Sequence, residues 1–119
     1  MDTRHKKRME TVQNIFAYTF LTDVSTLPFP NDLTQKIIDN MVAIDKTIAS
    51  LAVKFPIDKI AKIDLAILRL AVYELAIAPH EPIKVIINEA IELAKELGGE
   101  KSYSFVNGVL GKYIKQNEK

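Results

Sequence analysis

The segment that decides the fold is Ile-Asp-Leu-Ala-Ile-Leu-Arg-Leu-Ala-Val-Tyr-Glu-Leu, residues 63–75. When this segment is drawn as a helix, apolar side chains cover most of its circumference, and no part of the chain alternates apolar and polar residues as a half-buried strand does. A helix that is apolar on nearly every side has to be surrounded by other helices. The segment therefore predicts an all-α protein with a central helix over residues 63–78, ended by Pro79.

Helical periodicity continues on both sides of this central segment. Toward the N-terminus it predicts a first helix over residues 7–21 and, after a connector with two prolines, one long helix over residues 32–55. Toward the C-terminus it predicts a helix that follows Pro82 and stops at the glycine pair 98–99. Ser102 is the predicted cap of a last helix.

Length and composition limit the classes of protein that remain. With 119 residues and 48% apolar residues, the chain is expected to form one domain over residues 1–119 with a well-packed core. The chain has no cysteine, which excludes disulfides and thiolate metal sites and favours a reducing, cytoplasmic location. Because no uncharged stretch approaches the ~20 residues that cross a bilayer, no membrane partner is predicted.

The charge is distributed unevenly although the formal net charge is only +1. Residues 1–8 carry +3 and residues 112–119 carry +2, whereas residues 9–111 carry −4. Positive charge at the start of a helix opposes the helix macrodipole and costs stability. The basic N-terminal arm, residues 1–8, therefore indicates a polyanionic partner, although a merely solubilising terminus is the alternative.

No group of residues in the sequence has the spacing of a catalytic, metal or cofactor site. The two histidines, His5 and His80, lack a second ligand at metal spacing, and no glycine-rich phosphate loop occurs. Glu89, Glu92 and Glu96 fit a solvated helix face. The expectation is a protein that is not an enzyme and has no metal or cofactor.

Three motifs resemble the family of the transcription antitermination factor NusB. They lie at residues 63–75, 82–95 and 98–110, in the order and at the spacing of that family. The resemblance implies an all-helical fold of two small antiparallel bundles. It also implies binding of the single-stranded boxA element of nascent ribosomal RNA transcripts, together with the ribosomal protein NusE, and an indirect link to the RNA polymerase antitermination complex.

The resemblance also implies roles for individual residues. The family's RNA-binding arm corresponds to Arg4, Lys6, Lys7 and Arg8, and the rest of its RNA surface to Lys101, Ser102 and Phe105. Positions associated with the protein partner are Phe16 and Asp64. The remaining polar residues of the motifs are interpreted as structural: Arg69, Tyr73, Glu74, Asn88, Glu89 and Asn107. The region over residues 23–31 is short for the family, so a small helix is expected to be missing there.

Other functions remain open at this point. The chain could be a helical module for protein–protein interaction or homodimerisation that does not bind RNA. RNA cytosine methyltransferases carry a similar helical domain, but 119 residues leave no room for their catalytic domain. A helix-turn-helix DNA-binding protein is disfavoured, since the basic residues lie at the chain ends and not along an interior recognition helix.

Overall fold

A computed structural model describes residues 2–21 and 23–117 of the chain. The helices are α1 (Thr3–Leu21), α2 (Asp32–Asp39), α3 (Met41–Leu51), α4 (Lys62–Val72), α5 (Ile83–Leu97) and α6 (Glu100–Asn117). Two short 3₁₀ turns, η1 (Val24–Thr26) and η2 (Ile57–Lys59), lie in the connections, and a π-helix, η3 (Tyr73–Ile77), continues α4. Over these residues no strand occurs, so the prediction of an all-α protein is confirmed.

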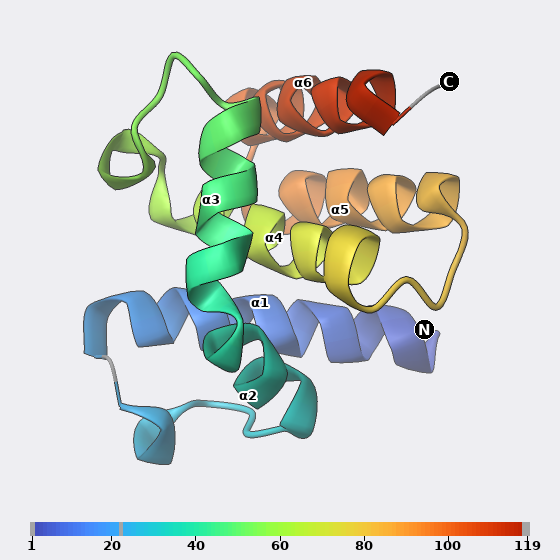
Figure 1. The fold of residues 1–119 in the computed structure, drawn as a ribbon. Coiled ribbons are helices and arrows are strands. Elements are labelled where there is room, and N and C mark those ends of the chain that lie inside the picture. The colour runs from blue at the N-terminus through green and yellow to red at the C-terminus, as the bar shows by residue number, and fades with distance from the viewer. Residues whose placement is uncertain (1, 22, 118–119) are drawn as a thin grey trace.

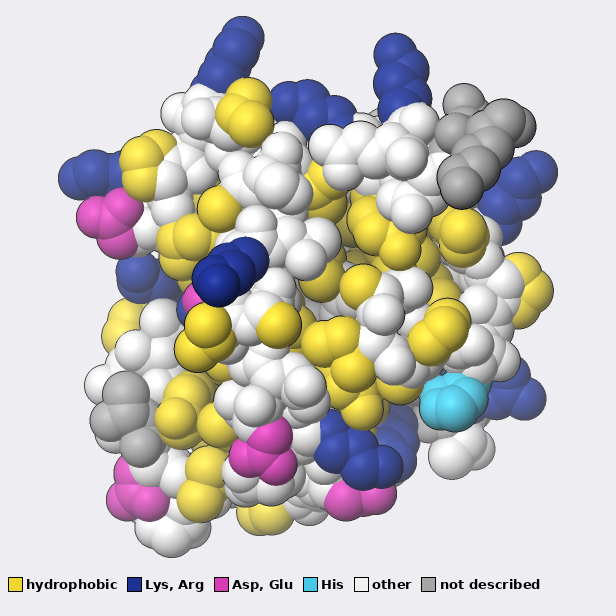
Figure 2. Space-filling model, in the orientation of Figure 1, with side chains coloured by type: hydrophobic (Ala, Val, Ile, Leu, Met, Phe, Trp, Pro, Cys, Tyr) yellow, Lys and Arg dark blue, Asp and Glu magenta, His cyan; other side chains and the backbone are white. Residues whose placement is uncertain are grey.

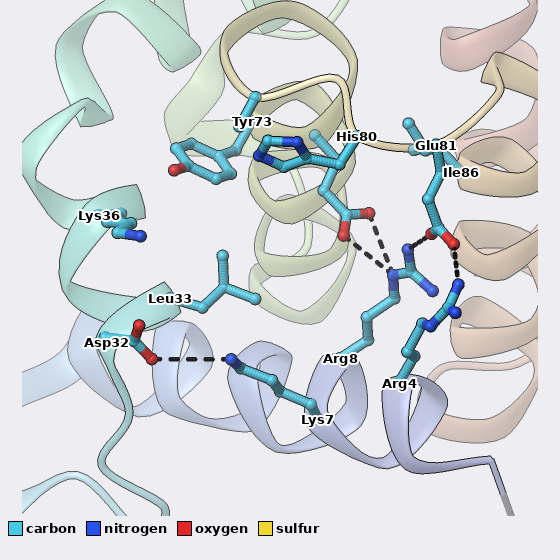
Figure 3. A pocket seen from close by; sticks show the side chains of 12 residues that line it. Arg4, Lys7, Arg8, Asp32, Leu33, Lys36, Tyr73, His80, Glu81 and Ile86 are labelled. Carbon is cyan, nitrogen blue, oxygen red and sulfur yellow. Dashed lines mark hydrogen bonds and ion pairs between the residues drawn. The ribbon is translucent and has the colours of Figure 1, made fainter.

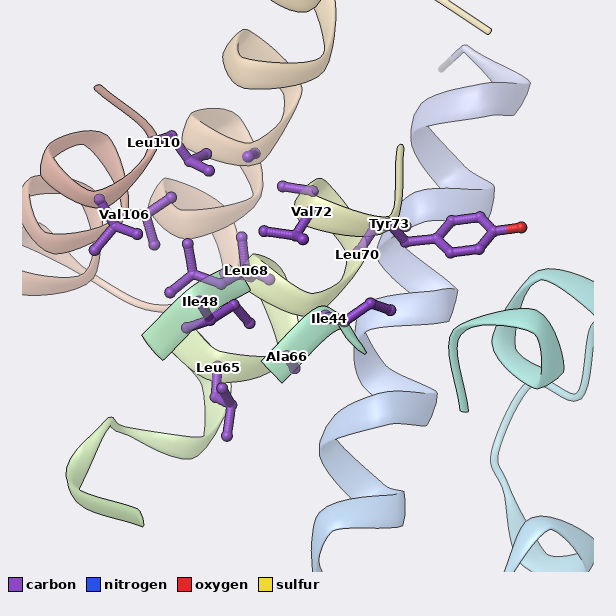
Figure 4. Close-up of a cluster of buried hydrophobic side chains, with 14 of the residues drawn as sticks. Ile44, Ile48, Leu65, Ala66, Leu68, Leu70, Val72, Tyr73, Val106 and Leu110 are labelled. Carbon is purple, nitrogen blue, oxygen red and sulfur yellow. The ribbon is translucent and has the colours of Figure 1, made fainter. Parts of the chain in front are cut away.

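Helix α4 is the centre of the molecule, as its sequence predicts. It contacts α1 on one side, α5 and α6 on the other, and α3, which crosses it (Figure 1). Its side chains from Leu65 to Leu68 are at most 2% exposed. They form one cluster with residues of α3 and α6 (Figure 4). Burying each Leu or Ile contributes about 1.5–3 kcal/mol, which makes α4 the main source of the packing energy.

The single long helix predicted over residues 32–55 is wrong, because the chain breaks at Asn40. The Asn40 side chain donates a hydrogen bond to the Lys36 carbonyl at 2.7 Å, and its backbone N–H bonds to Ile37. Asparagine side chains compete in this way with the regular helix pattern. The buried face still continues across the break through Ile37 and Ile44. Phe55, predicted in the same apolar seam, follows the end of α3 and is 48% exposed.

Helix α1 begins four residues earlier than predicted. Asp2 accepts a hydrogen bond from the Arg4 backbone N–H through its side chain, at 3.1 Å, and from the Lys6 backbone N–H through its carbonyl. Such bonds satisfy the free N–H groups of a helix start. The basic arm is therefore the first turns of a helix, and the spacing between its side chains is set by the helix.

The start of α6 also differs from the prediction. Helix α6 begins at Glu100, so Ser102 lies in its first turn and does not cap it. Gly98 ends α5, as predicted, and its backbone packs closely on Ser102. A Cβ atom at Gly98 would overlap the Ser102 side chain and approach the Ala94 carbonyl oxygen to 2.9 Å. Glycine is required here because the turn between α5 and α6 is too tight for a side chain.

The central helix ends in a wider turn. The Ala78 backbone N–H bonds to the Tyr73 carbonyl at 2.9 Å, five residues back, which is the π-helix pattern. The predicted end near residue 78 is therefore confirmed, with a π-helix as its last turn. Tyr73 and Glu74 lie in this turn, and both line the cavity described below.

A candidate nucleic-acid interface at the start of α1

Arg8 is the most buried of the predicted RNA-binding residues. Its side chain is 7% exposed, and its Nε donates to both carboxylate oxygens of Glu74, at 3.0 and 3.1 Å. Its Nη2 donates to Glu81, and its Nη1 lies 3.7 Å from a Glu89 oxygen (Figure 3 shows the pairs with Glu74 and Glu81). Three acidic side chains from η3, the following turn and α5 therefore surround one guanidinium. Arg8 ties α1 to the rest of the fold.

The pKa values of Glu74 and Glu81 are shifted in opposite directions, although the pair with Arg8 lowers both. Burial raises the pKa of Glu74, although the charge of Arg8 and its hydrogen bonds act against this shift. The hydrogen bond from Arg8 holds the pKa of Glu81 below its ordinary value, and Arg4 adds to the effect. Glu81 is thus firmly ionised at neutral pH.

His5 links α1 to α5. Its Nδ1 lies 2.6 Å from a Glu89 oxygen and its Nε2 2.6 Å from a Glu96 oxygen. The hydrogen bond with Glu89 raises the pKa of His5 more than its burial lowers it, and Glu96 raises it further. Glu89 and Glu96 are seven residues apart and so share one helix face. The interpretation of this face as merely solvated is wrong, since two of its three carboxylates bind His5.

The other basic side chains of the arm remain accessible. Arg4 pairs with Glu81 at 2.5 Å, but its side chain is 73% exposed. The Lys7 ammonium lies 3.6 Å from an Asp32 oxygen and forms a loose pair with it. The positive charge of Lys7 holds the pKa of Asp32 below its ordinary value. Lys6 is exposed, and no hydrogen bond or ion pair engages its side chain within the described part of the chain. The solvent-accessible cationic groups of the arm are therefore Arg4, Lys6 and Lys7.

A cavity of about 460 Å³ opens beside these residues, between α1, α2 and the turn that follows η3. Lys7 and Lys36 lie on one side of it, Arg4 and the Arg8–Glu81 pair on the other, and Tyr73 and His80 at its upper edge in Figure 3. Nothing in the sequence analysis singled out Lys36 or Tyr73 as site residues. Their proximity results from helix packing, since α2 and η3 are separated by more than thirty residues.

The second part of the predicted RNA surface lies at the start of α6. Lys101 is exposed, Ser102 is half-buried, and Phe105 packs edge to face on Phe55 with ring centroids 5.2 Å apart. No hydrogen bond or ion pair joins this segment to residues 4–8 over the ranges that the structure describes. The connection runs through α5, where His5 binds Glu96 two residues before Gly98.

The two predicted partner-binding residues lie at the opposite end of the α1–α4 pair. Because Arg8 meets Glu74 after the end of α4, the antiparallel arrangement in Figure 1 places the second half of α1 beside the first turn of α4. Phe16 is 36% exposed and packs edge to face on Phe20, which is 61% exposed. Asp64 is 7% exposed, and its Oδ1 has no hydrogen-bond partner among the described residues.

The polar residues of the family motifs have structural contacts in part. Arg69 forms a bidentate pair with Asp45 of α3, at 2.9 Å for both bonds. Glu74 and Glu89 hold the arm. Asn88 and Asn107 are exposed. Glu81 and Glu96 were missed, because a position in a turn and a position on an apparently solvated helix face gave no sign of pairing with the arm.

Neither a metal site nor a membrane-spanning helix is found in the described ranges 2–21 and 23–117. No cluster of three or more histidine and acidic side chains has an arrangement suited to a metal ion. None of the helices there combines the length and the apolar character that crossing a bilayer requires. Apolar side chains are nevertheless visible between lysine and arginine side chains on the face drawn in Figure 2.

The fold is that of NusB proteins. It superposes on T. maritima NusB with a TM-score of 0.85 and 29% sequence identity. The match covers 97% of this chain and 92% of that chain. A structure of the antitermination factors NusB and NusE in complex with dsRNA matches with a TM-score of 0.78 over 97% and 99% of the two chains. At 21% identity, that second match supports the fold alone.

The chain belongs to the NusB family, whose model matches residues 2–115. The transcription antitermination protein NusB of Acetivibrio thermocellus is 46% identical over 84 residues, which is 71% of this chain and 58% of that protein. The Bacillus subtilis protein of the same name is 44% identical over 90 residues, or 76% and 69% of the two chains. The family is one of antitermination factors and not of enzymes, in agreement with the expectation from the sequence.

Proposed function

We propose that this protein is a cytoplasmic transcription antitermination factor that binds single-stranded, boxA-type RNA of nascent ribosomal RNA transcripts together with NusE. The observation that supports RNA binding most directly is the exposure of Arg4, Lys6 and Lys7 on the first turns of one helix. Phosphate groups are the natural ligands of such a group of cations. Lys101, Ser102 and Phe105 are the proposed second contact with the same RNA.

The dependence of RNA affinity on salt tests the proposal. Each phosphate contact to a single strand lowers the logarithm of the affinity by about 0.7 per tenfold increase in salt. The three exposed cations of the arm predict a slope near −2, the exposed Lys101 makes it near −3, and each further phosphate contact adds about −0.7. Fluorescence anisotropy with a labelled boxA-type RNA, at several salt concentrations with and without NusE, measures this slope. Absence of binding at low salt with NusE present refutes the function.

A matched pair of variants separates specific contacts from general charge effects. Replacing Lys6 and Lys7 by Ala should reduce the slope by about 1.4, whatever the base sequence. The control replaces Lys46, an exposed lysine on α3, by Ala. Its slope should differ from that of the wild type by less than about half of the 0.7 that one phosphate contact contributes. Equal effects of the two changes would mean that binding reflects overall charge only.

We propose further that the end of the molecule with Phe16 and Asp64 is the contact with NusE. Phe16 and Phe20 offer an exposed aromatic surface, and Asp64 offers a desolvated carboxylate oxygen that lacks a partner within the chain as described. Because this oxygen is buried, a cationic or N–H group of a partner reaches it only if the first turn of α4 shifts on binding. Phe16→Ala and Asp64→Asn should weaken NusE binding and leave RNA affinity of the free protein unchanged. Calorimetric titration with NusE measures the first effect.

The competing function is a protein-interaction or homodimerisation module without RNA binding. The same exposed aromatic pair favours it as a second candidate. Light scattering of the free protein, combined with RNA titration, distinguishes the two functions. A dimer that dissociates in Phe16→Ala, together with no RNA affinity, would support the module and exclude the antitermination factor.

A further inference from the structure

We propose that the cavity beside the arm, between α1, α2 and the turn after η3, is a subsite for one nucleotide of a single-stranded RNA. The base enters the cavity and hydrogen-bonds to the Tyr73 hydroxyl, while the adjoining phosphate lies at Lys7 and Lys36. This inference rests on the proposed RNA-binding function and deepens it, because it assigns a base contact beside an arm whose own proposed contacts are with phosphate.

The Tyr73 hydroxyl is the first observation behind the subsite. The residue is only 7% exposed, and its ring extends from the hydrophobic cluster with the hydroxyl pointing away from it (Figure 4). No hydrogen bond to this hydroxyl is found over residues 2–21 and 23–117, although Tyr73 lines the cavity. Over these residues Asp64 Oδ1 is the one buried side-chain oxygen or nitrogen without a partner, so the Tyr73 hydroxyl is accessible from the cavity, where a ligand can bond to it. The hydroxyl of Tyr113, a half-buried tyrosine, instead has a partner within the chain, since it donates to the Leu75 carbonyl at 3.3 Å.

The size and lining of the cavity fit a base. Its volume of about 460 Å³ falls within the range of about 300–1,000 Å³ typical of small-molecule sites. Leu33, Ala78 and Ile86 supply apolar walls, and His80 supplies a second ring near Tyr73 (Figure 3). Apolar walls with a few polar groups are the arrangement that binds and orients an unstacked base.

The charges at the cavity favour a phosphate-bearing ligand. Glu74 and Glu81 line the cavity, but their carboxylates are occupied by Arg8, so they repel an anion less than free carboxylates would. Asp32 has only the loose pair with Lys7, and no ion pair or side-chain hydrogen bond of Lys36 occurs in the described ranges. The two lysine ammonium groups on the α2 side are thus available for phosphate.

The position of the cavity favours RNA over a free metabolite. Lys7 belongs both to the arm and to the cavity rim, and Arg4 lines the opposite side. A strand whose phosphates follow the arm therefore passes the cavity opening, where one base can leave the stack. Single-stranded RNA is commonly recognised by such splayed bases. A cavity at this point adds sequence preference to a contact that salt would otherwise dominate.

The test uses the full chain and a labelled boxA-type RNA, together with a series in which each nucleotide in turn is abasic. Tyr73→Phe keeps the ring and should weaken binding about three- to tenfold, the effect of one neutral hydrogen bond, without changing the salt slope. Lys36→Ala should reduce the slope by about 0.7. Tyr113→Phe, which removes a hydroxyl outside the cavity, is the control and should leave RNA affinity unchanged.

The abasic series locates the base. At one RNA position, removal of the base should lower the affinity of the wild-type protein and should lower the affinity of Tyr73→Phe markedly less. The reason is that the base and the Tyr73 hydroxyl form one hydrogen bond, which is lost when either is removed. If the two losses simply add at every position, or if Tyr73→Phe binds as tightly as the wild type, the subsite is refuted while RNA binding stands. A Tyr73→Phe protein that loses NusE affinity alone also refutes it. No binding of wild-type protein to RNA refutes the function itself.

Discussion

Replacing Arg8 by Ala should destabilise the protein far more than replacing any neighbouring cation of the arm. The guanidinium is 7% exposed and is held by Glu74, Glu81 and Glu89, whose own side chains are 17–22% exposed. Removing it leaves Glu74 without a counter-ion and leaves Glu81 and Glu89 with only their partners Arg4 and His5. Breaking a buried pair in this way costs about 3–5 kcal/mol, and the loss of packing by the Arg8 alkyl chain adds to this cost.

This loss is a large part of the free energy of unfolding, which for a domain is about 5–15 kcal/mol. For a domain of this size, 1 kcal/mol corresponds to about 4 °C in Tm, so a decrease of at least about 12 °C is expected. Urea unfolding followed by circular dichroism gives the free energy directly. Lys6→Ala is the matched control and should change stability by less than about 0.5 kcal/mol, because its side chain is exposed.

The variant Arg8→Met with Glu74→Gln tests the cause of the loss. Replacing a buried ion pair by neutral groups of similar size is often nearly neutral, so this double variant should recover part of the stability lost in Arg8→Ala. If Arg8→Ala unfolds within about 0.5 kcal/mol of the wild type, the ion-pair network does not hold α1, and the reasoning fails. Arg8 would then be free to contact RNA.

Two further predictions concern contacts that hold α1. His5 has a raised pKa, so its protonated form stabilises the fold below about pH 6.5, and this stabilisation is lost as the pH rises through the raised value. The stability difference between wild type and His5→Gln should therefore shrink between about pH 6 and about pH 9 in urea unfolding, and a constant or growing difference would contradict the assignment. Asn14 is fully buried and bonds to both backbone groups of Phe29 and to Thr34, each at 2.8 Å. Asn14→Ala should cost about 3 kcal/mol by chemical denaturation, whereas the exposed Asn117→Ala should cost almost nothing.

Much of the fold follows from local patterns. The apolar side chains of residues 63–75 predicted correctly that this helix is buried. Pro82 and Gly98 predicted the two ends of α5 to within one residue. The errors occurred where a single polar side chain changed the backbone. Asn40 divides the predicted long helix, and Asp2 extends α1 toward the N-terminus. Such side-chain bonds depend on one rotamer and leave the hydrophobic periodicity intact, so periodicity does not reveal them.

The candidate site was predictable only in part. The basic residues of the arm, and the family to which the chain belongs, were recognisable from residue types and their order. The sequence did not predict which of those cations stays accessible to solvent. Arg8 and Lys7 carry equal charge in the sequence and differ only in burial. The Tyr73 hydroxyl, which has no hydrogen-bond partner among residues 2–21 and 23–117, could not be predicted to be accessible from any local sequence pattern.

By itself, the sequence determined that the protein is all-helical, that residues 63–75 are its centre, and that its start is cationic. These properties depend on intervals of three to seven residues, which the helix repeat translates directly into faces. Only the tertiary structure decided the partners of the arm, since Arg8 and Glu74 are 66 residues apart and His5 and Glu96 are 91 residues apart. Over such separations the packing angles of α1, α4 and α5 select which charges meet, and no local repeat contains that information.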